Sequence, residues 1–342
     1  MKIIELRSDT FTLPTSEMKE TMFQAPLGDD VFGEDPSVLE LEAYTAEMFG
    51  MDAALFCPSG TMTNQIAINV HTQPGDEVIC DAESHIYYYE GGGIARNSGC
   101  QPRLIQGKFG KISPEQILPI INPDDVHRAR TRLVSLENTS NRGGGSCYDM
   151  VEIEHINRVC HQFGLKLHLD GARLMNAIVA KNQDPKNYGQ LFDSISLCLS
   201  KGLGAPVGSV LMGNREFIKE ARRVRKVMGG GMRQAGMLAA AGLYALRNHV
   251  HRLEEDHIKA KLLESILEEQ AWVEDILPVE TNIVVFKLIE SVSLQQFIAY
   301  LKEHSIHAAI FGPQQIRMVT HLNITDEDIQ TCIQVLEGFQ YP

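Results

Sequence analysis

The chain has 342 residues, of which 44% are hydrophobic and 22% are charged, and its formal net charge is −13. This length allows one large and one smaller domain with a substantial core, while the acidic balance argues against non-specific nucleic-acid binding. The sequence has no apolar run of membrane-spanning length and begins too polar for a signal peptide, so we expect no membrane partner.

The seven cysteines are scattered along the chain without a close C-x-x-C pair. An odd, dispersed set is typical of free thiols in a reducing compartment. The 12 histidines show no spacing typical of a zinc site. We therefore expect a cytoplasmic protein and predict no metal site.

Helical patterns alternate with short β-rich runs from residue 35 to residue 210. Asp35-Pro36 predicts the start of a helix that Gly50 can end. Short strands separated by helices indicate βαβ units and a mostly parallel sheet. Strands are predicted at 53–56, 77–80, 101–105, 132–136, 165–170 and 194–201, and further helices at 61–71 and 150–163.

After Val210 the pattern changes to mainly helical segments followed by a compact α+β region. We predict an N-terminal segment over 1–12, a large domain over 13–252 and a small C-terminal domain over 253–342, with the boundary inside a long helix. The predicted elements are helices at 215–228, 232–270, 294–304 and 326–339 and strands at 283–288, 306–310 and 316–319.

Two residues, Asp170 and Lys201, close apolar runs that are typical of buried strands, and glycine follows each. In an open α/β sheet, ligands bind in the crevice beyond the carboxyl ends of the strands. Pyridoxal phosphate needs a lysine for its Schiff base and a carboxylate beside its pyridinium nitrogen. The pair therefore predicts a site for this cofactor.

The segment Ser59-Gly60-Thr61 follows a predicted strand and opens a predicted helix. A helix N-terminus offers unpaired N–H groups to a phosphate, and glycine permits a close backbone approach. The alternative is an ordinary helix cap. On the residues alone, both interpretations stay open.

Three further side chains have two interpretations each. His85, at a strand–helix junction, could stack on a planar ring or move a proton, or be a partly buried helix residue. Arg173 could grip a carboxylate in bidentate fashion or lie on the surface. Arg317, inside an apolar strand pattern, could hold the substrate from the small domain or lie on an edge strand.

Several separate motifs in one order resemble the low-specificity L-threonine aldolases, which are fold-type I pyridoxal-phosphate enzymes. The resemblance covers almost the whole chain. It implies a fold-type I transferase-like α/β large domain with a mostly parallel seven-stranded sheet and a small C-terminal α+β domain. The motifs lie at 6–10, 28–36, 58–61, 135–139, 168–173, 199–204, 229–234 and 317–321.

The resemblance implies a role for each cofactor residue. Lys201 would form the Schiff base, Asp170 would pair with the pyridinium nitrogen, and His85 would stack on the ring. Arg233 would reach the phosphate from a neighbouring subunit. The cofactor-binding residues so implied are Ser59, Gly60, Thr61, His85, Asp170, Arg173, Ser200, Lys201 and Arg233.

The resemblance also implies how an amino-acid substrate is held. Ser8, Arg173 and Arg317 would bind its carboxylate, while Lys226 would lie near its hydroxyl side at a subunit interface. A homotetramer, built as a dimer of dimers with sites at the dimer interface, is expected. The substrate-binding residues so implied are Ser8, Tyr89, Ser140, Arg173, Lys226 and Arg317.

Two positions depart from the family pattern. Many members have histidine where this chain has Ser140, and many have tyrosine where it has Phe32. The family histidine is associated with the substrate hydroxyl. The preferred aldehyde and the configuration at Cβ therefore stay open.

The activity implied is cleavage of L-threonine, L-allo-threonine and related β-hydroxy-α-amino acids to glycine and an aldehyde, with Lys201, His85 and Asp170 as the catalytic residues. His85 is the favoured candidate for the base at the hydroxyl. A β-eliminating lyase or an aminotransferase would keep Lys201 and Asp170 and is the alternative. A non-catalytic cofactor-binding protein is opposed by the complete residue set, and a Rossmann oxidoreductase by the absence of G-x-G-x-x-G spacing at residues 202–204.

Overall fold

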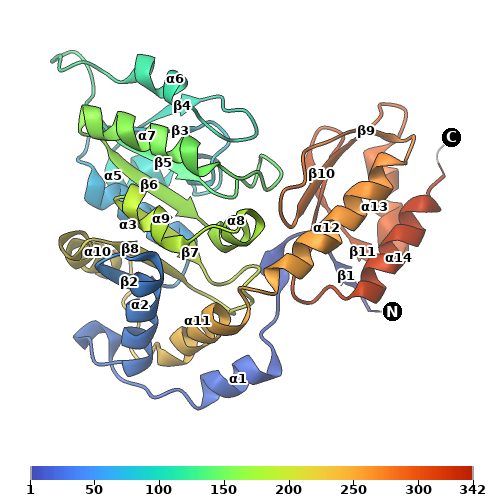
Figure 1. Cartoon of the computed structure of the whole chain (residues 1–342), viewed down its shortest axis with the longest axis horizontal. Coiled ribbons are helices and arrows are strands. Elements are labelled where there is room, and N and C mark those ends of the chain that lie inside the picture. Colours follow the sequence, from blue (N-terminus) through green and yellow to red (C-terminus); the bar gives the residue numbers. More distant parts are fainter. Residues whose placement is uncertain (1, 341–342) are drawn as a thin grey trace.

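The computed structural model describes residues 2–340 and contains two lobes (Figure 1). The larger lobe is built on a seven-stranded sheet in the order β2-β8-β7-β6-β5-β3-β4. Strand β8 is antiparallel to β7 and β2, and the other neighbouring pairs are parallel. The predicted mostly parallel seven-stranded sheet is confirmed. Its strands are β2 (Ala53–Cys57), β3 (Glu77–Asp81), β4 (Gln101–Ile105), β5 (Thr131–Glu137), β6 (Lys166–Gly171), β7 (Ser194–Cys198) and β8 (Ser209–Gly213).

Helices cover both faces of this sheet, because its central strands are apolar on both sides. On one face, α2, α7, α9 and α11 pack on residues such as Phe56, Leu169 and Ile195. On the other face, α3 and α10 pack on Leu55 and Leu211. The helices of this lobe are α1 (Ser16–Phe23), α2 (Pro36–Phe49), α3 (Gly60–His71), α4 (His85–Tyr88), α5 (Gly93–Ser98), α6 (Pro114–Ile117), α7 (Met150–Phe163), α8 (Leu174–Lys181), α9 (Pro185–Leu191), α10 (Arg215–Val227) and α11 (Gly236–Asn248), with 3-10 turns at Asp9–Phe11, Asp30–Phe32 and Leu118–Ile120.

The smaller lobe has its own core, in which Trp272, Phe286 and Phe297 contact one another beneath a four-stranded antiparallel sheet. The N-terminal strand β1 (Ile4–Glu5) crosses to this lobe and pairs in parallel with β11. The remaining elements are α12 (Leu253–Glu268), β9 (Val273–Ile276), β10 (Ile283–Leu288), α13 (Leu294–Glu303), β11 (Ile306–His307), β12 (Ala309–Gly312), β13 (Gln315–Val319) and α14 (Asp326–Glu337).

Three predicted elements differ from the structure. The strand predicted over 306–310 is two strands, β11 and β12, which belong to different sheets. The long helix predicted over 232–270 is two helices, α11 and α12, separated at residues 249–252. At this break the buried His249 side chain hydrogen-bonds to the Leu203 carbonyl over 2.7 Å, a tertiary contact that local sequence does not show. The predicted strand to Lys201 ends at Cys198, so Lys201 lies in the following loop. The division at 252/253 stays a prediction, which the α11–α12 break supports.

The described part of the chain has all seven cysteines buried and unpaired. Among its helices, none is long and apolar enough to cross a membrane.

Candidate active site

The carboxyl ends of β5, β6 and β7 bring the chemistry-bearing residues together. Glu137 is in register with Asp170, and Asp170 with Ser196. A cavity of about 350 Å³ opens here, between the two lobes. It is lined by Ser8, Thr10, His85, Tyr89, Glu137, Asn141, Ala172, Arg173, Lys201, Ala309, Ile310, Phe311 and Arg317.

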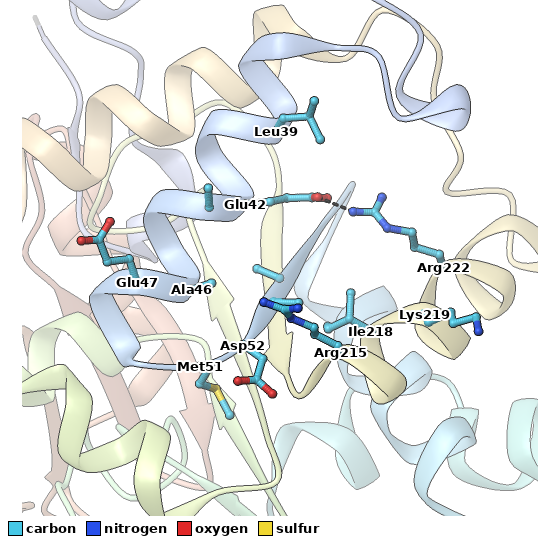
Figure 2. A pocket seen from close by; sticks show the side chains of 13 residues that line it. Leu39, Glu42, Ala46, Glu47, Met51, Asp52, Arg215, Ile218, Lys219 and Arg222 are labelled. Atoms are coloured by element: carbon cyan, nitrogen blue, oxygen red, sulfur yellow. Dashed lines mark hydrogen bonds and ion pairs between the residues drawn. The ribbon is translucent and has the colours of Figure 1, made fainter.

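A larger cavity, of about 670 Å³, lies elsewhere, between α2, β2 and α10 (Figure 2). Its buried carboxylate, Glu42, is paired with Arg222 and accepts a 2.9 Å hydrogen bond from the Phe56 N–H. These contacts hold α10 and α2 against strand β2. We therefore assign the chemistry to the strand-end cavity, which contains Lys201 and lies beside Asp170.

Asp170 is buried at the end of β6 and is held by two hydrogen bonds. Its Oδ2 accepts from Asn64 Nδ2 over 2.8 Å, and its Oδ1 accepts from the Ala172 N–H over 3.1 Å. One donor is a side chain on α3, and the other is the backbone N–H two residues after Asp170. This arrangement fixes the carboxylate orientation at the sheet edge, as the sequence prediction requires.

Lys201 lines the same cavity from the loop after β7. Its carbonyl accepts hydrogen bonds from Thr12 Oγ1 and the Gly204 N–H, which fix the loop backbone. Its ammonium Nζ is 3.8 Å from Cys198 Sγ. The backbone of Lys201 is therefore held by hydrogen bonds, while its amine, which lines the cavity, has only a weak contact to Cys198.

His85 begins α4 and faces Asp170 across the site. Its Nδ1 donates to the buried Glu90 Oε1 over 2.9 Å, and its ring lies 5.6 Å from that of Tyr89. Burial alone lowers the pKa of His85, but the hydrogen bond to Glu90 and the charges of Asp170, Glu90 and Glu137 raise it above its ordinary value. A ligand atom each from His85, Glu90 and Asp170 lies within 4.8 Å of the other two.

Arg173 lines the cavity, but most of its guanidinium is already engaged. Its Nε and Nη2 donate to the two Asp9 oxygens, each over 2.7 Å, in a buried bidentate pair. Burial raises the pKa of Asp9, but Arg173, Lys201 and Asn282 together hold it far below its usual range. Nη1 is the Arg173 nitrogen that Asp9 leaves for a ligand.

Arg317, on β13, reaches the cavity from the smaller lobe. Its Nη1 donates to Asn141 Oδ1 over 2.6 Å, and its Nη2 donates to the Arg7 carbonyl over 2.9 Å. Its guanidinium lies 4.8 Å from the centre of the Phe311 ring. Burial first, and then the positive charge of Arg173, lowers the pKa of Arg317 to about 10, so it stays cationic at neutral pH.

Glu137 joins the two sides of the cavity. Its oxygens accept from the His85 N–H over 2.6 Å and the Asn141 N–H over 2.7 Å. Burial, followed by the charge of Asp170, raises the pKa of Glu137. No role was predicted for Glu137, Asn141, Glu90, Asn64 or Asp9, although Glu137 and Asp9 lie inside the family-like motifs at 135–139 and 6–10.

The segment 59–61 forms the start of α3 beside the Lys201 loop. Ser59 caps the helix, and its Oγ accepts from the Met62 N–H over 3.2 Å. A Cβ at Gly60 would lie 2.5 Å from Cys198 Sγ, so this backbone approach requires glycine. The N–H groups at the helix start therefore remain close to the loop that contains Ser200 and Lys201.

Two predicted site residues, Lys226 and Arg233, do not line the strand-end cavity of their own chain. Lys226 lines a separate cavity together with Phe32 and Gly231. Arg233 pairs with Asp29 over 3.0 Å and is 54% exposed. Both are thus at the surface, where another subunit can meet them.

Ser140 also lies outside the cavity lining. Its hydroxyl accepts from the Gly143 N–H over 3.1 Å, and a Cβ at Gly110 would come within 2.0 Å of it. The side chain is therefore packed into its own loop, while the neighbouring Asn141 meets the cavity. Ser8, by contrast, lines the cavity with its Oγ 3.2 Å from the Thr10 N–H.

The residues present fit pyridoxal phosphate. A lysine amine lines the cavity, an oriented carboxylate ends the neighbouring strand, and the N-terminus of α3 at Gly60 can offer N–H groups to a phosphate. The fold with this site defines a fold-type I α/β enzyme.

Comparisons with known proteins support this class. The chain matches the family described as "Beta-eliminating lyase" over residues 5–291. It is 42% identical over 328 residues to a low-specificity L-threonine aldolase from Escherichia coli O157:H7, covering 96% of each chain. In fold it is similar to a threonine aldolase from Leishmania major, with a TM-score of 0.86 at 22% identity and 98% coverage of both chains.

The same fold also hosts other reactions. A protein from Escherichia coli described as having a methionine aminotransferase function matches with a TM-score of 0.78 at 16% identity, over 98% of this chain and 93% of that one. The chain itself belongs to the beta-eliminating lyase family, in the group that includes the low-specificity L-threonine aldolases. The resemblance drawn from the motifs is confirmed, and the chain is a member of a lyase family.

Proposed function

We propose that the protein uses pyridoxal phosphate to cleave L-threonine, L-allo-threonine and related β-hydroxy-α-amino acids into glycine and an aldehyde. The observation that carries the proposal is the shared cavity of Lys201, His85, Arg173 and Arg317 beside Asp170, in a chain 42% identical to a curated L-threonine aldolase. Parallel assays with L-threonine, L-allo-threonine and phenylserine test it. Release of glycine from at least one is expected, and release from none would contradict it.

Bound pyridoxal phosphate would supply an electron sink for the carbon–carbon bond that breaks. Lys201 would hold it covalently through Nζ, and Asp170 would keep its ring nitrogen protonated. The start of α3 at Gly60 and Thr61, with Ser59 and Ser200, would receive its phosphate. These assignments agree with the place of each residue around the strand ends.

The substrate carboxylate would bind between the two lobes. Arg317 and the Nη1 of Arg173 supply positive charge there, and Ser8 supplies a hydroxyl. Tyr89 would line the side that faces the substrate's β-substituent. Each arginine already donates from two nitrogens, Arg173 to Asp9 and Arg317 to Asn141 and the Arg7 carbonyl. The substrate carboxylate would therefore bind to the N–H groups that these contacts leave.

His85 would take the proton of the substrate hydroxyl, directly or through a water. Glu90 accepts from Nδ1, which leaves Nε2 as the nitrogen that can act as a base. Because the pKa of His85 is raised, it must lose its proton at a higher pH than an ordinary histidine. Activity should therefore fall, as pH is lowered, along a limb centred above about pH 6.5.

Replacing His85 with alanine should lower kcat for threonine cleavage by about 10²- to 10⁴-fold and remove that acidic limb. The measurement is the pH profile of kcat for the purified holoenzyme, with the cofactor absorption band as a control for cofactor binding. A variant that cleaves threonine at the wild-type rate would exclude His85 as the base.

We further propose that the active assembly is a homotetramer, a dimer of dimers, in which Arg233 and Lys226 complete the partner's site. Phe32 and Val227 expose 74% and 87% of their surface near these residues, a large apolar area for a monomer to leave open. We also propose a cytoplasmic location, which the free cysteines support.

Subunit complementation tests the shared site. Lys201→Ala and Arg233→Ala should each be nearly inactive alone, whereas subunit exchange should create hybrid dimers with one site that lacks both changes. Activity should therefore reappear on mixing. Hybrid oligomers no more active than their parents would contradict a site shared between subunits.

A further inference from the structure

A line of buried polar side chains runs behind Asp170, away from the cavity. Asn64 Nδ2 lies 2.8 Å from Asp170 Oδ2 and 2.9 Å from Glu90 Oε1, and Asn64 Oδ1 lies 3.2 Å from His168 Nε2. His168 Nδ1 lies 2.8 Å from Ser194 Oγ, which lies 2.8 Å from His71 Nε2. His168 and Ser194 have no exposed surface.

The two carboxylates fix the direction of the hydrogen bonds in this line. Asn64 Nδ2 has two hydrogens, and two carboxylate oxygens accept them. A flipped amide would place its oxygen against both carboxylates, so Asn64 Oδ1 must face His168. The donor in that contact is therefore His168 Nε2–H.

The next bonds follow from the charge state of the histidines. Burial lowers the pKa of His168 to about 4, so the ring is neutral and carries one proton, on Nε2. Its Nδ1 is then an acceptor, and the Ser194 hydroxyl donates to it. Ser194 Oγ in turn accepts from His71 Nε2–H. Burial and His168 lower the pKa of His71, whose ring stacks on Phe217 at 4.5 Å.

Asp170 and Glu90 each accept hydrogen bonds from other groups as well. Asp170 Oδ1 accepts from the Ala172 N–H, Glu90 Oε2 accepts from Gln65 Nε2 over 2.6 Å, and Glu90 Oε1 also accepts from His85. Asn64 is the only one of these donors that bonds both carboxylates. Its orientation therefore fixes how the Asp170 and Glu90 carboxyl groups lie relative to each other.

We propose that His168, backed by Ser194 and His71, is a positioning residue that locks the Asn64 amide and thereby holds Asp170 and Glu90 as two oriented carboxylates. It touches neither substrate nor cofactor. The inference rests on the proposed function in one respect, namely that Asp170 faces the cofactor ring nitrogen. Without the hydrogen bond from His168, the Asn64 amide can rotate, and the two carboxylates then repel each other. Asp170 and Glu90, the hydrogen-bond partner of His85, would both lose their fixed orientation.

Nitrogen NMR of the holoenzyme labelled with ¹⁵N-histidine tests the direction of the bonds without any activity measurement. We expect His168 to be neutral from pH 6 to pH 8, with Nε2 protonated and Nδ1 unprotonated. The His168→Gln spectrum identifies its signals. A His168 protonated at Nδ1, or an imidazolium at pH 6, would overturn the proposal.

A pair of variants tests the consequence. His168→Gln can keep a donor toward Asn64 and an acceptor toward Ser194, whereas His168→Leu keeps only the volume. We expect His168→Leu to lower kcat by about 10- to 100-fold with little change in KM, and to shift the pH titration of the cofactor absorption band. His168→Gln should restore both. His257→Leu is a matched control, because burial also lowers the pKa of the half-buried His257 to about 4, but His257 contacts Asn176.

Equal activity and equal spectra in His168→Gln and His168→Leu would contradict a role through hydrogen bonding, whether both were active or both impaired. If His168→Leu fails to fold, the wild-type NMR result still decides. The readouts also separate this inference from the proposed function. Correct tautomers and the expected spectral shift in a protein that releases no glycine would leave the positioning network standing and reject the aldol reaction.

Discussion

Replacing Lys201 with alanine should remove the absorption band of the Schiff base and lower threonine cleavage by more than about 10³-fold. Lys201 is the lysine that lines the strand-end cavity, and its backbone is fixed by Thr12 and Gly204. Alanine cannot form the covalent link, and added cofactor would bind only through its phosphate and ring contacts.

The measurement is an absorption spectrum of the variant after incubation with pyridoxal phosphate and removal of the excess, followed by a threonine assay. Lys219→Ala is a matched control, because Lys219 lines the larger cavity between α2, β2 and α10 and should leave both readouts unchanged. A Schiff-base band that survives in Lys201→Ala would reject the assigned lysine.

Replacing Asp9 with alanine should destabilise the protein by about 3–5 kcal/mol, because it leaves the Arg173 guanidinium buried without its carboxylate. The pair joins the N-terminal segment to the start of α8, so the change should also raise KM. Urea unfolding at pH 7 measures the loss. Glu40→Ala, which breaks the exposed Arg247–Glu40 pair, is the control and should cost less than about 1 kcal/mol.

The same pair has a defined pH dependence. Because the pKa of Asp9 is lower in the folded chain than in the unfolded chain, its stabilisation is fully present above the unfolded value of about 3.9. It is lost as pH falls through the lowered folded value. The wild type should therefore lose stability relative to Asp9→Asn below about pH 4, and parallel curves for the two proteins would contradict the assignment.

The sequence pattern predicted six of the seven strands of the larger sheet because their signal is local, but it did not predict β8. In residues 165–170, leucines alternate with polar residues, and the topology places the end of this strand at the sheet edge. Asp170 and Lys201 could be found in this way. The break between α11 and α12 could not, because His249 turns toward a carbonyl that lies 46 positions earlier.

The partners of the predicted site residues were missed for a related reason. Asp9 meets Arg173 across 164 positions, and Asn64 meets Asp170 across 106. Residues so far apart in the chain form no local pattern from which their contact could be predicted. Ser140 is a predicted substrate-binding residue, but its side chain packs against Gly110 and does not line the cavity, whereas Asn141 does.

The fate of L-threonine tests most directly whether this chain breaks the Cα–Cβ bond of a hydroxy amino acid. The measurement is a mass-spectrometric product analysis of the holoenzyme incubated with L-threonine. We expect glycine and acetaldehyde in equal amounts, with no ammonia released. Ammonia with a keto acid, or transfer of the amino group to an added keto acid without glycine, would contradict it and assign the chain to elimination or transamination instead.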